Sequence, residues 1–346
     1  MRILKGAKRT INKVDLLIKI NKLKKVKNNE KIIYLLSPEH GNMGDQAIAI
    51  AIKKYLQENF NDKVILEFSY LEYTLIKDNL ITIINDKDII FLHGGGNLGN
   101  LYINEENLRR DVINRFQKNK IIIMPQSISF TKDNNGAHEL EKTKKIYSEH
   151  DNLNIICREN KSFKTAQEIF PKNQLLLAPD SVMYLEDYYM QTLKNRSGIL
   201  LALRSDKEKV IDDNLIKKIK DAINDTDEKI IYRDTIISKK VNEKNRVSEF
   251  NKMLDSFASS KLVITDRFHG VIFSVITKTP CIVFKSLDHK ISEGIKWFDN
   301  MEYVHYSEDE NENLNDIIKK FLNLEIASTN NELKSKLVNE MSRIIV

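Results

Sequence analysis

Short apolar runs alternate with amphipathic stretches along the chain from residue 31 onward. Six runs lie at residues 31–38, 64–68, 88–97, 121–126, 154–159 and 174–180, and four more follow at 198–204, 228–234, 261–266 and 280–284. Strands that are apolar on both faces and alternate with helices form parallel sheets covered by helices on each side. The pattern therefore predicts an α/β protein with two Rossmann-like domains.

The chain is predicted to divide into four parts. A polar stretch near residues 190–197 is the expected hinge between the two series of strands. The predicted parts are a basic amphipathic N-terminal arm at residues 1–30, an N-terminal Rossmann-like domain at 31–193, a C-terminal Rossmann-like domain at 194–305 and a C-terminal helical segment at 306–346. We expect the last segment to pack across the domain junction.

Composition narrows the class of protein. The 346 residues are 41% hydrophobic and 30% charged, which is enough to build a large core. No apolar stretch approaches the roughly 20 residues that cross a bilayer, and the N-terminal residues lack the apolar segment of a signal peptide, so we expect a cytoplasmic protein, either free or peripheral on the inner face of the cell membrane. Cys157 and Cys281 lie in apolar runs and are too few for a disulfide framework or a zinc site, so we expect buried thiols and no metal.

The positive charge is concentrated in the arm. Residues 1–30 hold ten Lys and Arg against two acidic residues, a net charge of +8, whereas the whole chain carries +6. Ile11, Val14, Leu17 and Ile18 recur at helical spacing among these lysines. Two interpretations fit: a helix on an anionic membrane surface, or a lysine-rich arm that packs its stripe on the body. Nucleic-acid binding is not expected, because no aromatic residues interleave the lysines.

Polar residues follow several predicted strands, where ligands of open parallel sheets sit. Residues 37–46 form a glycine-flanked turn that contains Asn42 and Asp45, and a helix N-terminus of this kind suits an anion or a sugar hydroxyl. Residues 93–99 place His93, three consecutive glycines, Asn97 and a fourth glycine after a strong strand. The spacing matches neither the dinucleotide fingerprint nor the Walker loop, which argues against NAD and ATP.

Two basic positions stand at strand ends of the second series. Arg204 ends the run at residues 198–204, and Arg267 and His269 follow the run at 261–266. We expect Asp266 to cap the next helix, whose first turn would then form an anion site with a titratable proton donor. The alternative is a capped helix with an incidental basic pair.

Taken in order, these segments resemble the polysaccharide pyruvyl transferase family. The matching pieces are GNMGDQAI, LHGGGNLGNLY, IIIMPQSISF, ICREN, LLLAPD, LALR and ITDRFHGVIFSVITKTPCIVF, which span about residues 33–297. The resemblance implies two Rossmann-like domains that face each other across a cleft, similar to GT-B glycosyltransferases. It also implies transfer of the carboxyethylidene group of phosphoenolpyruvate to two sugar hydroxyls, giving a ketal and phosphate without a cofactor.

The resemblance assigns roles to the strand-end residues. It implies that His269 transfers the proton and that Arg267 and Arg204 bind the donor in the second domain. Lys290, in the loop after the run at residues 280–284, is a further candidate for donor binding, and the alternative for it is a solvated lysine. The first domain would then hold the acceptor sugar, and its candidate residues are Asn42, Asp45, His93, Asn97 and Gln126. Asp180 is expected to orient a basic residue or to cap a turn.

The expected acceptor is a sugar of a lipid-linked capsule or exopolysaccharide repeat unit at the inner face of the cell membrane. In this interpretation residues 1–28 bring the enzyme to the anionic membrane surface. Two alternatives stay open: a GT-B glycosyltransferase that uses a nucleotide sugar, and a non-catalytic component of a polysaccharide assembly machine.

Overall fold

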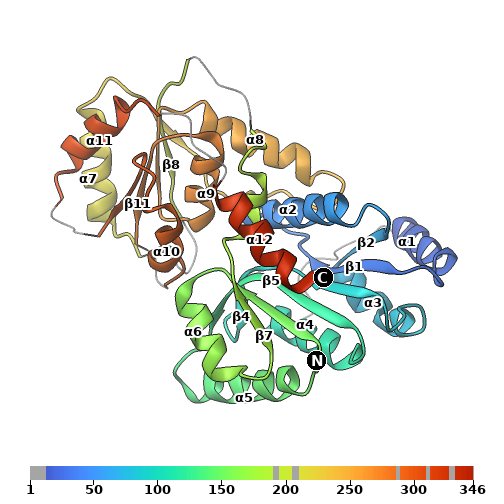
Figure 1. Ribbon diagram of the computed structural model, residues 1–346. Coiled ribbons are helices and arrows are strands. Elements are labelled where there is room, and N and C mark those ends of the chain that lie inside the picture. The colour runs from blue at the N-terminus through green and yellow to red at the C-terminus, as the bar shows by residue number, and fades with distance from the viewer. Residues whose placement is uncertain are drawn as a thin grey trace.

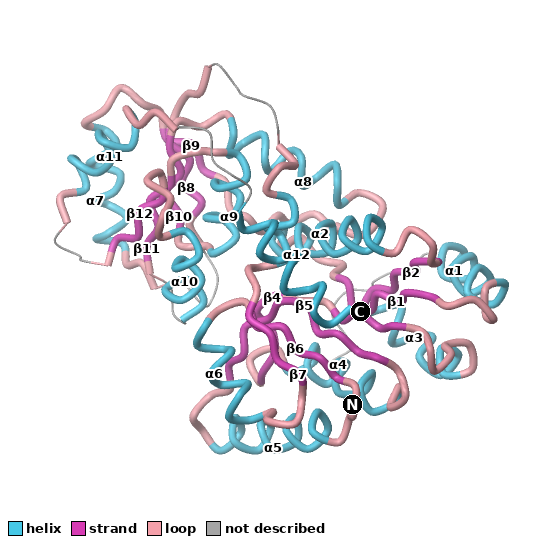
Figure 2. Tube along the Cα trace, in the orientation of Figure 1, coloured by secondary structure: helices cyan, strands magenta, loops and turns pink. Residues whose placement is uncertain are grey.

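Two parallel sheets, each flanked by helices, form the protein (Figures 1 and 2). The structure is a computed structural model that describes residues 13–189, 195–204, 210–285, 289–308, 312–326 and 332–345. The predicted α/β class with parallel sheets is confirmed. The arm's residues 1–12 and most of the expected hinge, residues 190–194, lie outside the described residues, as does Ser205, which follows Arg204.

The first sheet carries the strands of the N-terminal half. They are β1 (Lys31–Ser37), β2 (Val64–Ser69), β3 (Ile89–Leu92), β4 (Gly95–Gly99), β5 (Lys120–Ser129), β6 (Leu153–Cys157) and β7 (Gln174–Leu177). Their order is β2-β1-β3-β5-β6-β7, with β4 beside β5. The helices of this half are α2 (Met43–Asn59), α3 (Tyr70–Ile81), α4 (Ile103–Arg115), α5 (Asn134–Ser148) and α6 (Asn160–Ile169), followed by the 3₁₀ turn η1 (Ser181–Leu185).

The segment that contains the three consecutive glycines forms the short strand β4. β4 runs parallel to β5, with Gly95 opposite Gln126 and Gly99 opposite Ser129. Gly99 has φ +141°, and a Cβ there would lie 1.7 Å from the Ser129 carbonyl oxygen. Glycine is therefore required because backbone approaches backbone at this point.

The second sheet has the order β12-β11-β10-β8-β9. Its strands are β8 (Ile199–Ala202), β9 (Ile230–Tyr232), β10 (Leu262–Thr265), β11 (Cys281–Phe284) and β12 (Val304–Ser307). Its helices are α7 (Asp213–Asn224), α8 (Arg246–Ala258), α9 (Phe268–Thr277), α10 (His289–Gly294) and α11 (Leu314–Leu322), with the 3₁₀ turn η2 (Ile295–Phe298) after α10. The sequence pattern did not predict β12, which pairs with β11 at the sheet edge.

The last helix, α12 (Glu332–Ile345), returns to the first half of the chain and packs against η1 (Figure 1). Leu337 and Met341 are buried in a core that also contains residues of α2. Lys334 Nζ lies 2.7 Å from Asp187 Oδ2, and the Lys334 amide donates to Glu186. The C-terminal segment thus ties the two halves together.

A second connection joins the segment after β9 to the loop before α2. The Met43 amide donates to the Thr235 carbonyl at 2.9 Å, and the Ile237 amide donates to the Gly41 carbonyl at 2.8 Å. Arg246, at the start of α8, reaches Gln46 in α2 and Glu67 in β2. These contacts fix the loop at residues 38–42 and the first turn of α2 against the second half.

The N-terminal helix α1 (Lys13–Lys25) packs on the first half with a different face from the predicted one. Leu16 and Leu23 are buried in the core, whereas Leu17 is 58% and Ile18 is 60% exposed. Of the two interpretations of the arm, the one in which its apolar stripe packs on the body therefore does not hold for Leu17 and Ile18. The side chain of Val14, like the whole of Ile11, lies outside the described residues.

Two smaller expectations can be checked in the described part of the chain. Cys157 and Cys281 are free and buried, as expected, and burial raises the pKa of Cys281 to about 12. No described helix is both long and apolar enough to cross a membrane.

Candidate active site

A cavity of about 410 Å³ lies between the two halves of the chain. Seven of the nine predicted site residues line it: Asn42, Asp45, Asn97, Arg204, Arg267, His269 and Lys290. The cavity is also lined by His40, Tyr102, Glu105, Arg158, Thr235 and Phe268, among others. Residues that are far apart in the sequence therefore meet at the carboxyl ends of both sheets, as parallel topology requires.

The turn between β10 and α9 brings Arg204 and Arg267 to the same wall. The Thr265 hydroxyl accepts from the Arg267 amide, and Asp266 Oδ1 accepts from the Arg204 amide at 2.8 Å. The prediction that Asp266 caps α9 is wrong, because Arg267 occupies the N-cap position and Asp266 turns toward Arg204. Burial raises the pKa of Asp266 to about 6, against the opposing effect of the two arginines.

The Arg267 guanidinium is anchored by a carboxylate from the segment after β9. Its Nη2 lies 2.7 Å from Asp234 Oδ2, and the side chain is only 7% exposed. Thr235, which follows Asp234, holds the start of α2. The same short segment therefore positions a basic residue of the second half and the polar loop of the first half.

His269 lies in the first turn of α9 and is largely buried between the halves, with 13% of its side chain exposed. Its Nε2 is 3.8 Å from Asp180 Oδ2. Burial lowers the pKa of His269, and the charges of Arg158 and Arg267 lower it further, while Asp180 and Asp45 raise it. The imidazole is therefore mainly neutral at pH 7 in the unliganded cleft.

Arg158 is a cleft residue that the sequence argument did not select. It follows β6 directly, and its Nε donates to Ser127 while its Nη1 lies 2.8 Å from Asp180 Oδ2. The guanidinium stands 4.9 Å from the ring centre of Phe268. Its place at a strand end inside the segment ICREN was the signal that could have identified it.

Asp180 connects the two basic groups. One carboxylate oxygen faces Arg158 and His269, and the other accepts from the Val182 amide at the start of η1. The two expectations for Asp180, orienting a basic residue and capping a turn, are both seen in its contacts.

Lys290 approaches the cleft from α10. A Cβ on Gly96 would lie 2.8 Å from Arg158 Nη2 and 3.1 Å from Lys290 Cε, so glycine leaves the room that these cations occupy. Lys290 Nζ also lies 5.9 Å from the ring centre of Tyr102. Gly96, the third of the three consecutive glycines, therefore makes room for side chains, whereas Gly99 makes room for backbone.

The opposite wall is built around Asn42, Asp45 and Asn97. Asn42 Oδ1 accepts from the Gly44 amide and caps α2, and its Nδ2 donates to Asp45 Oδ2 at 2.9 Å. Asn97 Oδ1 accepts from Arg109 at 2.6 Å and from Gln126 at 2.7 Å. This wall thus presents amide and carboxylate groups.

Two of the predicted acceptor residues do not line this cavity. Gln126 is fully buried behind Asn97 and contacts it. His93 lines a small adjoining cavity, together with Asp45 and Asn97. His40 and Glu105, which the sequence argument did not select, line both cavities.

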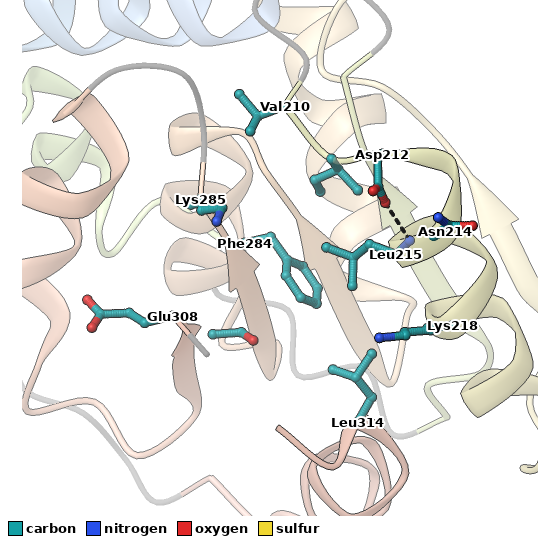
Figure 3. A pocket seen from close by; sticks show the side chains of 11 residues that line it. Val210, Asp212, Asn214, Leu215, Lys218, Phe284, Lys285, Glu308 and Leu314 are labelled. Carbon is teal, nitrogen blue, oxygen red and sulfur yellow. Dashed lines mark hydrogen bonds between the residues drawn. The ribbon is translucent and has the colours of Figure 1, made fainter. Parts of the chain in front are cut away.

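A separate cavity of about 350 Å³ lies between α7 and the ends of β11 and β12 (Figure 3). Phe284 and Leu215 face each other across it, and its charged residues are of both signs, with Lys218 and Lys285 against Asp212 and Glu308. It contains none of the predicted site residues. The cleft between the halves is therefore the candidate active site.

No group of three or more His, Cys, Asp or Glu side chains within the described ranges has the arrangement of a metal site. The charged groups that can meet a small anionic substrate in the cleft are Arg158, Arg204, Arg267 and Lys290. A cluster of guanidinium and ammonium groups recognises carboxylates and phosphates through charge-assisted hydrogen bonds.

Comparison with known proteins gives a consistent result. The sequence signature of the family described as "Polysaccharide pyruvyl transferase" matches residues 42–289. The chain is 37% identical over 303 residues to "General stress protein 30" of Bacillus subtilis (strain 168), covering 81% of this chain and 82% of that protein. It is 27% identical over 270 residues to "Pyruvyl transferase 1" of Schizosaccharomyces pombe, covering 74% and 66%.

Solved structures share the fold. An uncharacterized protein from Klebsiella pneumoniae aligns with a TM-score of 0.57 at 19% identity, covering 87% of this chain and all of that one. An α,α-trehalose 6-phosphate synthase from Burkholderia multivorans aligns with a TM-score of 0.50 at 9% identity, covering 91% and 94%. The predicted GT-B-like fold is thereby confirmed.

Proposed function

The chain belongs to the polysaccharide pyruvyl transferase family, and from this premise we propose that it transfers the carboxyethylidene group of phosphoenolpyruvate to two hydroxyls of a sugar. The products are a cyclic pyruvate ketal and inorganic phosphate. The observation that carries the proposal is the convergence of four cationic side chains and one buried imidazole in a cleft whose other wall is amide and carboxylate.

The basic wall suits the donor. Phosphoenolpyruvate has a carboxylate and a phosphate on adjacent positions, and Arg158, Arg204 and Arg267 offer guanidinium groups to both. Asp180 and Asp234 hold two of these arginines in place, which limits the ordering needed when the donor binds. The cavity of about 410 Å³ is in the range of small-molecule sites. Lys290 adds a fourth positive charge.

His269 is the proposed proton-transfer residue. The charges of the bound donor oppose those of the arginines, so binding raises the pKa of His269 and the imidazole takes up a proton. The imidazolium then gives that proton to C3 of the enol, which becomes a methyl group, and the oxygen of the first sugar hydroxyl bonds to C2. The proton of this hydroxyl returns to the imidazole.

The second half of the reaction closes the ketal. The C2–O bond to phosphate breaks, and phosphate leaves with the electron pair. The oxygen of the second hydroxyl then bonds to C2 and loses its proton, which we assign to the Asp45 carboxylate on the acceptor wall. Asn42 holds Asp45 through one oxygen and leaves the other toward the substrate. Gln126 positions Asn97 from behind.

The proposed acceptor is a sugar of a lipid-linked capsule or exopolysaccharide repeat unit. Support comes from α1, which presents the apolar residues Leu17 and Ile18 on the same helix as the exposed Lys22 and Lys25. A helix with exposed apolar and basic residues suits an anionic membrane surface, where a lipid-borne acceptor would be found. The domain roles proposed here are donor in the second half and acceptor in the first.

The test is a turnover assay with phosphoenolpyruvate and a panel of lipid-linked and synthetic glycosides, following phosphate release and the mass of the sugar product. Ketal formation is expected with phosphoenolpyruvate and not with nucleotide sugars. Turnover with nucleotide sugars alone would replace the proposal by a glycosyltransferase, and no turnover with either would favour a non-catalytic assembly component. The variant His269→Gln is the matched control, because it should still bind the donor but lose at least 10²-fold in turnover.

A further inference from the structure

A small cavity of about 30 Å³ opens beside the acceptor wall of the cleft. Four polar residues line both spaces: His40, Asp45, Asn97 and Glu105. The small cavity is completed by Leu36, Pro38, Tyr70, His93, Leu108 and Arg109. Its volume is enough for one oxygen-bearing group and too small for a sugar ring.

His93 has one ring nitrogen satisfied and one free among the described residues. The Tyr34 hydroxyl lies 2.6 Å from Nδ1, both side chains are buried, and Nε2 has no hydrogen-bond partner. Burial keeps the pKa of Tyr34 well above 10 and holds the pKa of His93 well below 6.5, so the phenol is protonated and the imidazole is neutral.

These facts assign the tautomer of His93. If Nδ1 carried the proton, the buried Tyr34 hydroxyl hydrogen and the Nε2 lone pair would both lack partners in the described part of the chain. If Tyr34 donates to Nδ1, one group alone is unsatisfied, and that group is Nε2–H. His93 therefore carries a fixed, unsatisfied N–H donor at Nε2, and its side chain lines the small cavity.

The neighbouring groups offer both kinds of hydrogen bond. Asn97 Oδ1 is occupied by Arg109 and Gln126, which fixes the amide orientation and leaves Nδ2 as a donor. Glu105 lines both cavities and adds a carboxylate that can accept a hydrogen bond. A ligand group that accepts from the donors and donates to Glu105 is a hydroxyl, whereas a methyl group would leave Nε2–H unsatisfied.

The backbone beside this cavity is strained. Leu36, which lines it, has φ +66°, and the pairing of β1 with β2 shifts register between Leu35 and Ser37. A branched side chain in the left-handed region is costly and is found where the local structure serves a site. The bulge therefore supports a ligand-binding role for this corner of β1.

We propose that the small cavity is a specificity pocket that receives one hydroxyl of the acceptor sugar, and that His93 Nε2–H donates to its oxygen. The sugar class of the ligand rests on the proposed function, while the hydroxyl requirement rests on the geometry of the pocket. The hydroxyl bound in the small cavity is a third one, separate from the two that react with the donor, because the small cavity lies beside the main cavity. Acceptors that lack this hydroxyl are selected against.

The test uses the full-length protein and a panel of methyl glycosides of glucose, galactose and mannose, each with its monodeoxy derivatives. Binding is measured by ligand-observed NMR, and ketal transfer from phosphoenolpyruvate is measured in parallel. One deoxy position in the preferred glycoside should weaken binding by roughly 10- to 100-fold. His93→Asn, which keeps an acceptor for Tyr34 but lacks the group at Nε2, should remove that discrimination, and His93→Gln, which keeps an amide donor there, should retain part of it.

A second measurement does not depend on turnover. The ¹⁵N shifts of His93 should report the Nε2–H tautomer in the free protein, and the tautomer should become mixed in Tyr34→Phe. Glycoside binding with these signatures but no ketal formation would support the pocket and reject pyruvyl transfer. Ketal formation in which His93→Asn still distinguishes the parent glycoside from its deoxy derivative would overturn the pocket and leave pyruvyl transfer intact. Observation of the Nδ1–H tautomer in the free protein would likewise overturn the pocket without affecting pyruvyl transfer. Absence of any glycoside binding would also overturn the pocket.

Discussion

The backbone of Gly44 lies against the imidazole of His269, so closely that a Cβ on residue 44 would stand 2.3 Å from Nδ1. Gly44 is the second residue of α2 in the first half, and His269 is in the first turn of α9 in the second half. Gly44 therefore sets where the proposed proton-transfer group lies.

Gly44→Ala tests this contact. The added methyl group must push the imidazole from its place, and we expect turnover to fall about 10²-fold, since displacements near 1 Å have that effect on catalysis. The free energy of unfolding should change by less than about 1 kcal/mol, because alanine favours the helical backbone and the ring can move into the cleft. Steady-state kinetics and urea unfolding measure the two effects. Equal activity in Gly44→Ala and the parent protein would show that the ring position does not matter.

Asp180→Asn tests the carboxylate between Arg158 and His269. Asparagine retains an oxygen for the Val182 amide, so the turn at η1 should persist. The negative charge of Asp180 raises the pKa of His269, and its loss should shift the protonation of the imidazole to lower pH. We expect kcat/KM for phosphoenolpyruvate to fall at least 10-fold at pH 7. If Asp180 had only a structural role, Asp180→Asn would lower the free energy of unfolding and leave the pH dependence of kcat/KM unchanged.

The pH profile of the parent enzyme follows from the same residue. Burial lowers the pKa of His269 in the free enzyme below its ordinary value of 6.5, and the proposed reaction requires the protonated imidazole. We therefore expect kcat/KM for phosphoenolpyruvate to decrease as pH rises through a pKa below 6.5. The profile of kcat should decrease at higher pH, because the bound anion raises the pKa in the complex. Coincident profiles would contradict proton uptake on donor binding.

The sequence predicted most of the side chains that line the candidate cleft, because strand ends are visible in the hydrophobic pattern. Arg267 and His269 stand directly after a strong apolar run, so parallel topology alone places them at the ligand edge. Arg158 has the same kind of position after β6, but its importance depends on Asp180 and Phe268, which come from distant segments. The relative placement of these elements is a property of the packed halves.

The face of α1 shows another limit of sequence patterns. The stripe that contains Leu17 and Ile18 and the stripe of Leu16, Ile20 and Leu23 both have helical spacing. Only the surface on which the helix packs decides between them, and that surface selects Leu16 and Leu23.

Arg246→Met tests the joint between the two halves. Arg246 and Glu67 are each 3% exposed, with Nη1 2.6 Å from Oε1, and Arg246 also donates to Gln46. Removing the guanidinium leaves a buried carboxylate with Lys53 at 3.4 Å as its remaining cation. We expect a loss of about 3 kcal/mol or more in the free energy of unfolding by urea titration.

Two further variants define the control for this joint. The double variant Arg246→Met/Glu67→Gln should recover part of the loss, because the uncompensated charge is gone. Arg343→Met breaks a pair with Glu340 in which Arg343 is 64% exposed, and it should change stability by less than about 1 kcal/mol. Similar losses for the buried and exposed pairs would show that the joint contributes little.

The exposed face of α1 makes the membrane proposal testable without deleting the arm. Removing residues 1–28 would uncover the core at Leu16 and Leu23, so loss of binding in that variant could reflect unfolding. The double variant Leu17→Asn/Ile18→Asn changes only exposed side chains and should keep the thermal midpoint within a few degrees. Sedimentation with vesicles rich in anionic lipid should fall about 10-fold or more, because two apolar side chains no longer enter the interface.

The basic residues of the same helix give an independent measure of this binding. Lys22→Gln and Lys25→Gln should each weaken sedimentation with anionic vesicles about 5-fold at low salt, since each charge contributes about 1 kcal/mol near such a surface. Added salt should reduce the effect of the lysines while sparing that of Leu17 and Ile18, because screening acts on charge and not on apolar burial. Vesicles of neutral lipid are the control and should bind all variants weakly. Unchanged sedimentation of both the apolar and the lysine variants would reject α1 as the membrane contact. Binding to a membrane that carries the acceptor would then require a different surface of the protein.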